Sequence, residues 1–367
     1  MEKLKFSDVF DDITRQGTKI QANQYLVCGK YQIIDQSQND IAGYTNQEEG
    51  LFTDIPAIVF GDHTRVIKYV DKPCFLGADG VKLLRAKDSK ANYKYLYYVL
   101  TNARIPDTGY NRHFKWLKEI NIPLYDEETQ NNIVKELEKI TNLIDKQKKQ
   151  LEKLDELVKS RFVEMFGNGN YPMVKAESVC EFITKGTTPP TGEIYAEFDD
   201  NKVPYLKVYN LSFDGSLLFD SEPQYINKEI HNGKLSRSKV YPNDVLMNIV
   251  GPPLGKFSLV TAEYPEWNIN QAISIFRAKK DVLPRFLLSA LMQPTVLKPF
   301  LKQAVGVRQL NISLEQCRNL QFPLPPIERQ NEFVNFAEQT DKSKLEVQKS
   351  LEKLELLKKA LMQKYFG

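Results

Sequence analysis

A segment of 48 residues occurs twice in this chain and constrains its fold more than any other feature. Residues 120–167 align with residues 320–367 without a gap, and about 16 of the aligned positions are identical. The identical positions include the Leu-Glu-Lys-Leu run at 151–154 and 351–354 and the Phe-Gly pair that closes each copy. The chain therefore has two similar halves, and each half ends in the same kind of segment.

Each copy has the pattern of one long helix. In the first copy, residues on the apolar seam alternate four and three positions apart, which keeps them on one face of a slightly supercoiled helix. They are Ile133, Leu137, Ile140, Ile144, Leu151, Leu154 and Val158, with polar Gln147 between them. Acidic residues at 126–128 favour a helix start, and Gly167 favours its end. We predict long helices within 126–167 and 326–367, and about 37 helical residues at 1.5 Å each give a rod of roughly 55 Å.

The second helix has a more polar seam, because Thr340, Lys344 and Lys358 fall on it. The simplest way to bury both seams is to pair the two helices as an antiparallel coiled coil, with Val347 opposite Gln147. Such a pair would relate the two halves by a pseudo-twofold axis. The alternative for the outer faces of these helices is a purely structural stalk with a solvated surface.

The remaining parts of the chain are mixed and rich in strands, which predicts an α+β fold with two similar mixed domains. Short β-branched or aromatic runs bounded by Gly, Pro, Asp and Asn predict strands at 31–34, 57–60, 66–70, 245–250 and 272–276. Helices are predicted at 93–102 and 284–293. The repeat also extends weakly into these parts, since the sequence around Val9 and Ile13 resembles that around Val179 and Ile183. We expect domains at 1–125 and 168–325, each followed by its long helix at 126–167 or 326–367.

Composition narrows the class of protein without identifying a partner. The length of 367 residues and 42% apolar content are typical of chains with packed domains, and the net charge of +3 is too small to indicate a polyanion partner by itself. The four cysteines lie far apart without a Cys-x-x-Cys pair, and the three histidines are scattered. A cytoplasmic protein without a membrane span or metal site is the expectation.

The motifs for catalysis are incomplete. Residues 251–256 resemble a phosphate-binding loop, but the spacing is one residue short and two prolines remove amide donors. Pro252-Pro253 lacks the flanking residues of an amino-methyltransferase motif, and Asp88-Ser-Lys90 and Asp200-Asn-Lys202 lack an upstream carboxylate for a nuclease. We expect no catalytic centre and no cofactor or metal in this chain.

The segment Gly-Tyr-Asn-Arg-His-Phe-Lys-Trp at 109–116 is the strongest candidate for a binding site. It interleaves cations, aromatic rings and amide or imidazole groups, which nucleic-acid surfaces use for phosphate and base contacts. The matching position in the second half reads Gly-Val-Arg-Gln-Leu-Asn at 306–311. The alternative is an ordinary loop whose Phe114 and Trp116 pack in the core.

Further candidates flank glycine-rich turns at matched places in the two halves. The full set of candidate DNA contacts is Arg15, Tyr44, Asn46, His63, Arg65, Tyr110, Asn111, Arg112, His113, Lys115, Lys185, Lys207, Asn210, Asn248, Lys256, Arg308, Gln309 and Asn311.

This layout resembles the specificity subunits of Type I restriction-modification systems over nearly the whole chain. The most specific similarities are Ile-Pro-Leu at 122–124 with Gln130-Asn131 and Phe-Pro-Leu-Pro-Pro at 322–326 with Gln330-Asn331. Gly-Asp-His-Thr at 61–64 and Gly-Tyr-Asn-Arg-His at 109–113 add to them. Tyr125-Asp126 replaces the proline pair that the second copy has at 325–326, which puts the start of the first helix in question.

The resemblance implies that the chain is a non-catalytic DNA-recognition subunit. Each domain would read one half of a bipartite target on double-stranded DNA, and the paired helices would set the unread spacer. Two methyltransferase subunits would dock around the helices, and motor-nuclease subunits would cut unmodified DNA. S-adenosylmethionine, ATP and Mg would belong to those partner subunits. The competing class is a coiled-coil adaptor that displays two peptide- or glycan-binding modules.

Overall fold

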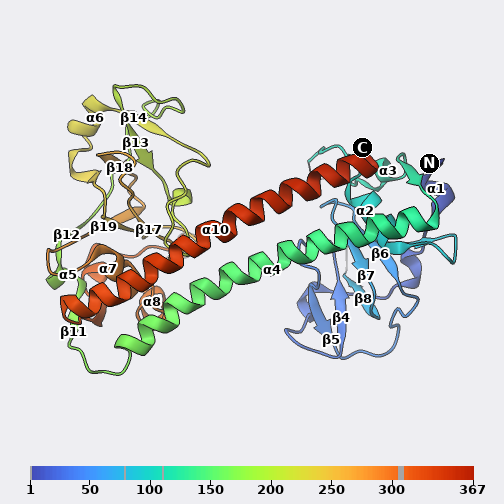
Figure 1. Ribbon diagram of the computed structural model, residues 1–367, viewed down its shortest axis with the longest axis horizontal. Helices are drawn as coiled ribbons and strands as arrows, with labels where there is room; N and C mark the ends of the chain where they lie inside the picture. Colours follow the sequence, from blue (N-terminus) through green and yellow to red (C-terminus); the bar gives the residue numbers. More distant parts are fainter. Residues whose placement is uncertain (1, 78–79, 110, 305–309) are drawn as a thin grey trace. The chain divides into compact units, whose positions relative to one another are not determined.

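The computed structural model describes residues 2–77, 80–109, 111–304 and 310–367. The chain divides into two compact units, Met1–Lys148 with Lys349–Gly367 (unit 1) and Lys149–Gln348 (unit 2). Two long helices, α4 (Glu127–Phe166) and α10 (Ile327–Phe366), each contribute a part to both units (Figure 1). Among the residues described, no helix is long and apolar enough to cross a membrane.

In unit 1, the two helices run antiparallel. The Tyr365 hydroxyl donates to Glu136 Oε2 at 2.6 Å, and Gln147 Nε2 donates to Ser350 Oγ at 3.4 Å, so positions rise along α4 as they fall along α10. The predicted seam is confirmed, since Ile133, Leu137, Ile140 and Ile144 are all buried. Gln147 finds its hydrogen bond on Ser350, whereas the sequence predicted that apolar Val347 would face it.

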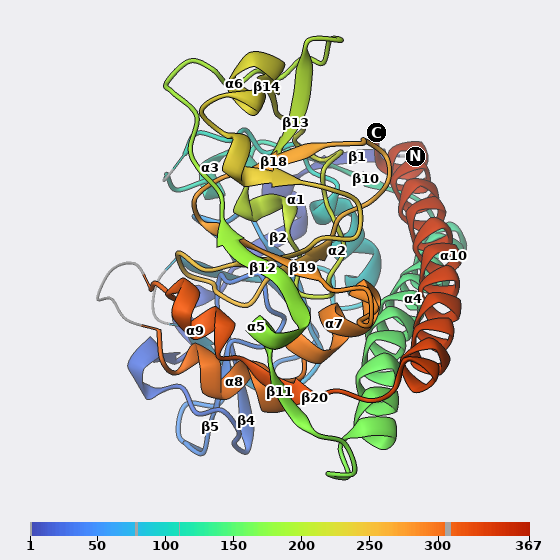
Figure 2. The ribbon, with the colours of Figure 1, turned by 90° about the vertical axis from the view of Figure 1, so that its left-hand side faces the viewer.

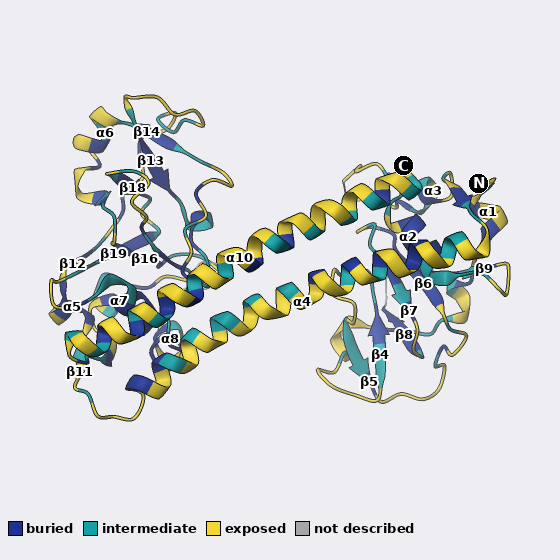
Figure 3. Ribbon diagram, in the orientation of Figure 1, coloured by how far each residue is buried: buried dark blue, intermediate teal, exposed yellow. Residues whose placement is uncertain are grey.

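In unit 2, α4 and α10 also run antiparallel. Lys344 Nζ lies 2.5 Å from Asp155 Oδ1, and the rings of Phe162 and Phe333 are 5.3 Å apart. Buried and exposed residues alternate as stripes along both helices (Figure 3). The predicted antiparallel helix pair is therefore present in each unit.

Unit 1 contains a two-stranded sheet and two four-stranded sheets. Strands β1 and β10 pair antiparallel, the order β2-β9-β6-β7 is antiparallel throughout, and the order β3-β8-β4-β5 includes parallel pairs of β8 with β3 and β4. The strands are β1 (Glu2–Lys5), β2 (Phe10–Asp12), β3 (Lys19–Ile20), β4 (Tyr31–Ile34), β5 (Gly43–Thr45), β6 (Ala57–Gly61), β7 (Ile67–Val70), β8 (Cys74–Gly77), β9 (Val81–Ala86) and β10 (Asn121–Leu124). The short helices are α1 (Phe6–Val9), α2 (Tyr93–Thr101) and α3 (Phe114–Leu117).

Unit 2 repeats this plan with small differences. Strands β11 and β20 pair antiparallel, and β12 lies beside β19 (Figure 2). The order β12-β19-β16-β17 is antiparallel, and the order β14-β13-β18-β15 has one parallel pair, β13 with β18. The strands are β11 (Met173–Lys175), β12 (Cys180–Lys185), β13 (Lys202–Leu206), β14 (Tyr225–Asn227), β15 (Lys239–Val240), β16 (Val245–Asn248), β17 (Phe257–Leu259), β18 (Trp267–Ile269), β19 (Ile273–Ala278) and β20 (Gln321–Pro323). The helices are α5 (Ala176–Val179), α6 (Lys228–Asn232), α7 (Pro284–Leu291), α8 (Pro294–Leu301) and α9 (Leu314–Arg318).

Matched hydrogen bonds confirm the weak repeat between the two domains. Lys87 N donates to Val9 O at 2.9 Å, and Lys279 N donates to Val179 O at 2.9 Å. The predicted strands and helices are present with small shifts at their ends. The strand predicted over 245–250 stops at Asn248, because Val250 leaves the sheet to bridge Asn311. Each unit thus has the predicted α+β fold.

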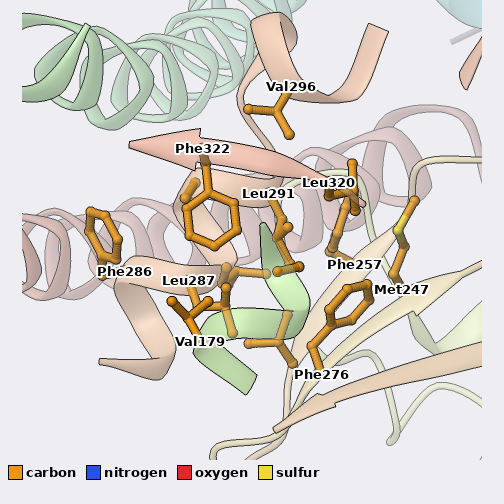
Figure 4. Packing of buried hydrophobic residues seen from close by; sticks show 14 of the residues in the cluster. Val179, Met247, Phe257, Phe276, Phe286, Leu287, Leu291, Val296, Leu320 and Phe322 are labelled. Atoms are coloured by element: carbon orange, nitrogen blue, oxygen red, sulfur yellow. The ribbon is translucent and has the colours of Figure 1, made fainter. Parts of the chain in front are cut away.

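In unit 2, one hydrophobic core is shared by the antiparallel sheet β12-β19-β16-β17, helix α7 and the long helices α4 and α10. Side chains from α7, β19 and β20 point toward one another, including Phe276, Leu287 and Phe322 (Figure 4). Phe286 of α7 lies 5.6 Å from Phe162 and is fully buried. Because burying a Phe side chain contributes roughly 1.5–3 kcal/mol, these rings hold the domain firmly on α4 and α10.

Candidate nucleic-acid interface

In each unit, the turn after one strand of the antiparallel sheet, β6 or β16, is hydrogen-bonded to the loop before a short helix, α3 or α9. In unit 1, His113 N donates to Asp62 O at 2.8 Å, which connects the turn after β6 to the loop before α3. In unit 2, Ile312 N donates to Ile249 O at 2.9 Å, which connects the turn after β16 to the loop before α9. These two connections occupy equivalent places, and we call each turn with its loop a turn-and-loop site.

Buried Asp62 organises the site in unit 1. Its Oδ1 accepts from Phe114 N at 2.7 Å, its backbone N donates to Gly80 O at 2.6 Å, and its carbonyl lies 3.0 Å from His113 Nδ1. Three separate segments therefore meet at one residue. This arrangement brings the predicted residues at 63–65 beside those at 111–115.

The polar side chains of this site contact one another at its surface. His63 Nδ1 lies 3.2 Å from Asn111 O, and Arg65 donates to Asp107 Oδ2 at 2.7 Å. The Gly109 amide and the Arg65 guanidinium lower the pKa of the Asp107 carboxyl. Arg112 and Lys115 are exposed, with Lys115 Nζ 4.0 Å from the centroid of the Trp116 ring. The site therefore presents cations beside an aromatic ring.

The site in unit 2 has the same construction with other residues. Asn248 Oδ1 accepts from Lys256 N at 2.7 Å and its Nδ2 donates to Pro253 O at 2.9 Å, which closes the turn. Val250 bridges Asn311, and Gly251 N donates to Leu310 O at 2.9 Å. Lys256 is half-buried and Asn311 is exposed, so both can reach a ligand. Predicted contacts Tyr110, Arg308 and Gln309 lie outside the described residues.

Three predicted contacts have buried side chains that form hydrogen bonds with the backbone of their own domain. His113 is 1% exposed, and Asn210 and Asn248 are fully buried. Asn210 accepts from Lys207 N at 2.8 Å and donates to Leu218 O at 3.1 Å, so its amide is used within the domain. These residues shape the loops and do not reach solvent.

The other predicted residues belong to segments outside the turn-and-loop sites. Arg15 and Lys185 are exposed at matched places after β2 and at the end of β12. Tyr44 exchanges two backbone hydrogen bonds with Leu26, and Asn46 Oδ1 accepts from Lys30 N at 3.0 Å, so both hold the loop at 26–30. Lys207 directly follows β13.

The alternative for the aromatic rings is correct in part. Phe114 packs against Phe6 and Phe60, with ring centroids 6.0 Å away in both cases, and it belongs to the core of unit 1. Trp116 is half-buried and lies 5.3 Å from the His113 ring.

Sequence reasoning missed two residues that touch the sites, Gln36 and Phe213. Gln36 Oε1 accepts from His63 N at 3.2 Å, and the Phe213 ring lies 5.8 Å from Lys256 Nζ. An aromatic residue directly before Asp214-Gly215, at a tight turn, was the available signal for Phe213.

The structure bears on two kinds of chemistry, metal binding and thiol catalysis. Within the described ranges, no group of three or more His, Cys, Asp or Glu residues is placed to hold a metal ion. All four cysteines are free, and burial raises the pKa of the Cys74, Cys180 and Cys317 thiols to about 12. These three thiols are therefore poor nucleophiles at neutral pH.

Comparison with known proteins gives one consistent result. The specificity subunit of the Type I restriction enzyme EcoBI from Escherichia coli is 30% identical over 148 residues, a match that spans 38% of this chain and 30% of that subunit. The MjaVIII specificity subunit from Methanocaldococcus jannaschii is 24% identical over 316 residues, or 78% of this chain and 74% of that subunit.

Solved structures agree at the level of the fold. The S subunit of a Type I restriction-modification system from M. genitalium has a TM-score of 0.54 at 18% identity, covering 100% of this chain and 96% of that chain. A chain from a study of complex assembly in the Type I system also has a TM-score of 0.54, at 17% identity, covering 100% and 97%. The family model for the Type I restriction modification DNA specificity domain matches residues 1–156 and again residues 168–356. With nearly the whole sequence matched by two copies of this model, the chain belongs to the family of Type I restriction-modification DNA specificity proteins.

Proposed function

We propose that this chain supplies sequence specificity to a Type I restriction-modification complex, with each unit reading one half of a bipartite target on double-stranded DNA. The observation that supports this most directly is the pair of turn-and-loop sites. They sit at equivalent places in two domains that share the same antiparallel four-stranded sheet, yet their side chains differ. A common scaffold with different surface residues suits two readers of different short sequences.

The proposal divides the chain into two readers and two spacers. Residues 1–125 and 168–325 form the reading domains, and the helices at 126–167 and 326–367 set the length of the unread spacer. Arg112, Lys115, Lys256 and Asn311 are the exposed or half-buried residues that we assign to DNA contacts among the described parts of the sites. Arg suits guanine or phosphate, Asn suits adenine, and Lys suits phosphate.

The partners follow from the same proposal. Two methyltransferase subunits dock around the helices, and motor-nuclease subunits join them in a cytoplasmic complex. The chain itself is not an enzyme, so S-adenosylmethionine, ATP and Mg are held by the partner subunits. Nothing in the family match or the relatives supports the alternative of an adaptor with peptide- or glycan-binding modules.

Mapping of methylated adenines tests the function. Cells that produce the chain with its methyltransferase partner should show adenine methylation at one bipartite sequence, and deletion of the chain should remove that methylation. Replacing residues 168–325 with the matching domain of another family member should change one half of the sequence and leave the other half unchanged. Methylation that persists without the chain, or a continuous target without a spacer, would contradict the proposal.

A further inference from the structure

The segment that follows β4 in unit 1 reaches the turn-and-loop site of that unit. Gln36 lies two residues beyond β4, its Oε1 accepts from His63 N at 3.2 Å, and its backbone O accepts from Thr64 Oγ1 at 2.6 Å. Gly80 has a φ of +67°, and a Cβ there would lie 2.5 Å from Gln36 Oε1. Gln36 is therefore closely held against the turn, and its side chain remains half-buried.

The equivalent segment of unit 2 follows β13 and reaches the equivalent place. There the chain forms a small hairpin at 211–217, closed by a bridge between Leu211 and Leu217. Ser212 and Phe257 exchange backbone hydrogen bonds of 3.0 and 2.8 Å, so the hairpin extends the edge of β17. This pairing places Phe213 next to Lys256, the residue that closes the turn of the site.

Phe213 is an exposed ring on an anchored hairpin. Its side chain is 56% exposed, although the residues around it are fixed. Asp214 accepts from Ser216 Oγ at 3.0 Å and from Lys344 Nζ at 3.2 Å, which connects the hairpin to α10. The hairpin therefore fixes the backbone that carries the ring at the surface.

An exposed phenylalanine beside a lysine suits contact with DNA. Apolar rings at DNA surfaces pack on the thymine methyl group or insert between base steps, while a nearby cation neutralises phosphate. The amide of a glutamine can pair with the N6 and N7 positions of adenine. Gln36 in unit 1 and Phe213 in unit 2 differ in chemistry, as expected if the turn-and-loop sites of the two units read different bases.

We propose that the segment after β4 and β13 is a third DNA-contacting element of each site, with Gln36 and Phe213 as its specificity-determining residues. The inference rests on the proposed function, because it assigns these residues to the same two reading sites. The structure adds them to the loops that the sequence already indicated.

The test uses the full chain in complex with its methyltransferase partner. Methylation rates are measured on duplexes that carry the target and on duplexes with single base changes in either half. Phe213→Ala should lower discrimination in one half of the target by about 5- to 100-fold and leave the other half unchanged. Gln36→Ala should do the same for the opposite half, so each variant is a control for the other.

Phe198 provides the matched control, because it is 51% exposed and packs beside Tyr225, outside the site. Phe198→Ala should leave discrimination in both halves unchanged. Phe213→Leu keeps apolar bulk and should retain part of the discrimination if the ring packs on a methyl group.

Two results would overturn the inference while the proposed function stands. One is a Phe213→Ala complex with unchanged discrimination in both halves. The other is a Phe213→Ala chain that binds its methyltransferase partner less well without any change in discrimination, which would make the ring a protein contact. If the wild-type complex has no bipartite specificity at all, the proposed function itself fails.

Discussion

At the scale of single residues, Asp214 has the clearest electrostatic role in unit 2. Burial disfavours its charged form, but hydrogen bonds from Ser212 and Ser216 and the charge of Lys344 outweigh burial and lower the pKa to about 2. A carboxyl group with a lowered folded-state pKa stabilises the fold above its unfolded pKa of about 3.9. That stabilisation is lost as the pH falls from about 3.9 toward 2.

The variant Asp214→Asn should therefore lower the free energy of unfolding by about 1–2 kcal/mol at pH 7. This range is smaller than the pKa shift alone implies, because the Asp214 side chain is 35% exposed and water screens its charge. The difference from wild type should shrink as the pH falls below 4. Urea unfolding at pH 7, 4 and 2.5 measures it, with exposed Asp200→Asn as the control. A difference that stays constant with pH would show that the charge of Asp214 contributes nothing.

Arg112 allows a test of how unit 1 contacts DNA, since its side chain is exposed in the turn-and-loop site. Arg112→Ala should weaken methylation of target duplexes by about 5- to 100-fold. If Arg112 pairs with a guanine, Arg112→Lys should remain defective and tolerate base changes in one half of the target, because lysine cannot form the same fork. If Arg112 binds phosphate, lysine should restore most of the rate. Full activity of Arg112→Ala would assign the residue to an ordinary loop.

At the scale of elements, the long helices could be predicted from the sequence and the sheets could not. In α4 and α10, the seam residues recur four and three positions apart along 40-residue helices. This regular spacing in the sequence indicates both the helix and its buried face. The strands are short, and partners such as β3 and β8 lie far apart in the sequence, so no local pattern gives their order. Composition marked the segments at 109–116 and 306–311 as candidate binding loops. Composition could not show that Asn210 and Asn248 bond to the backbone, because a polar residue in a turn can serve the backbone as well as a ligand.

The glutamine shared by the two repeat copies stabilises the start of each long helix to different extents. Gln330 is 1% exposed, donates to Pro325 O at 3.0 Å and to Asp281 O at 3.2 Å, and accepts from Leu283 N at 2.9 Å. Gln130 is half-buried and donates to Tyr125 O at 2.8 Å. The replacement of the proline pair by Tyr125-Asp126 leaves the start of α4 capped, because Asp126 accepts from Thr129 N at 2.9 Å.

Because Gln330 is more deeply buried and forms more hydrogen bonds than Gln130, replacing each of them with alanine should destabilise the protein to different extents. Gln330→Ala should lower the free energy of unfolding by about 2–4 kcal/mol, because it leaves buried backbone groups without partners. Gln130→Ala should cost less than about 1.5 kcal/mol, because fewer groups lose a bond and water can replace it. Urea unfolding of the two variants gives the comparison, and equal losses would contradict the assignment.

At the scale of the whole molecule, duplication gives one chain two readers without making them identical. The two domains share the antiparallel sheet and the connection from its turn to the following loop. The residues that we propose to contact DNA differ, with Gln36, Arg112 and Lys115 in unit 1 and Phe213, Lys256 and Asn311 in unit 2. The two halves of the target should therefore differ in sequence, and the complete target should not be a palindrome.

The helices provide the test of how the two readings are spaced. Inserting one heptad after Gln147 and another after Val347 preserves the seam period and lengthens the pair by about 10.5 Å, or roughly three base pairs. The unread spacer of the target should grow by that amount, while both half-sites keep their sequences. Insertion into one helix alone breaks the register of the pair and should abolish methylation. Methylated-adenine mapping reads the spacer directly, and a spacer that stays the same after the double insertion would mean that the helices do not determine the distance between the two readings.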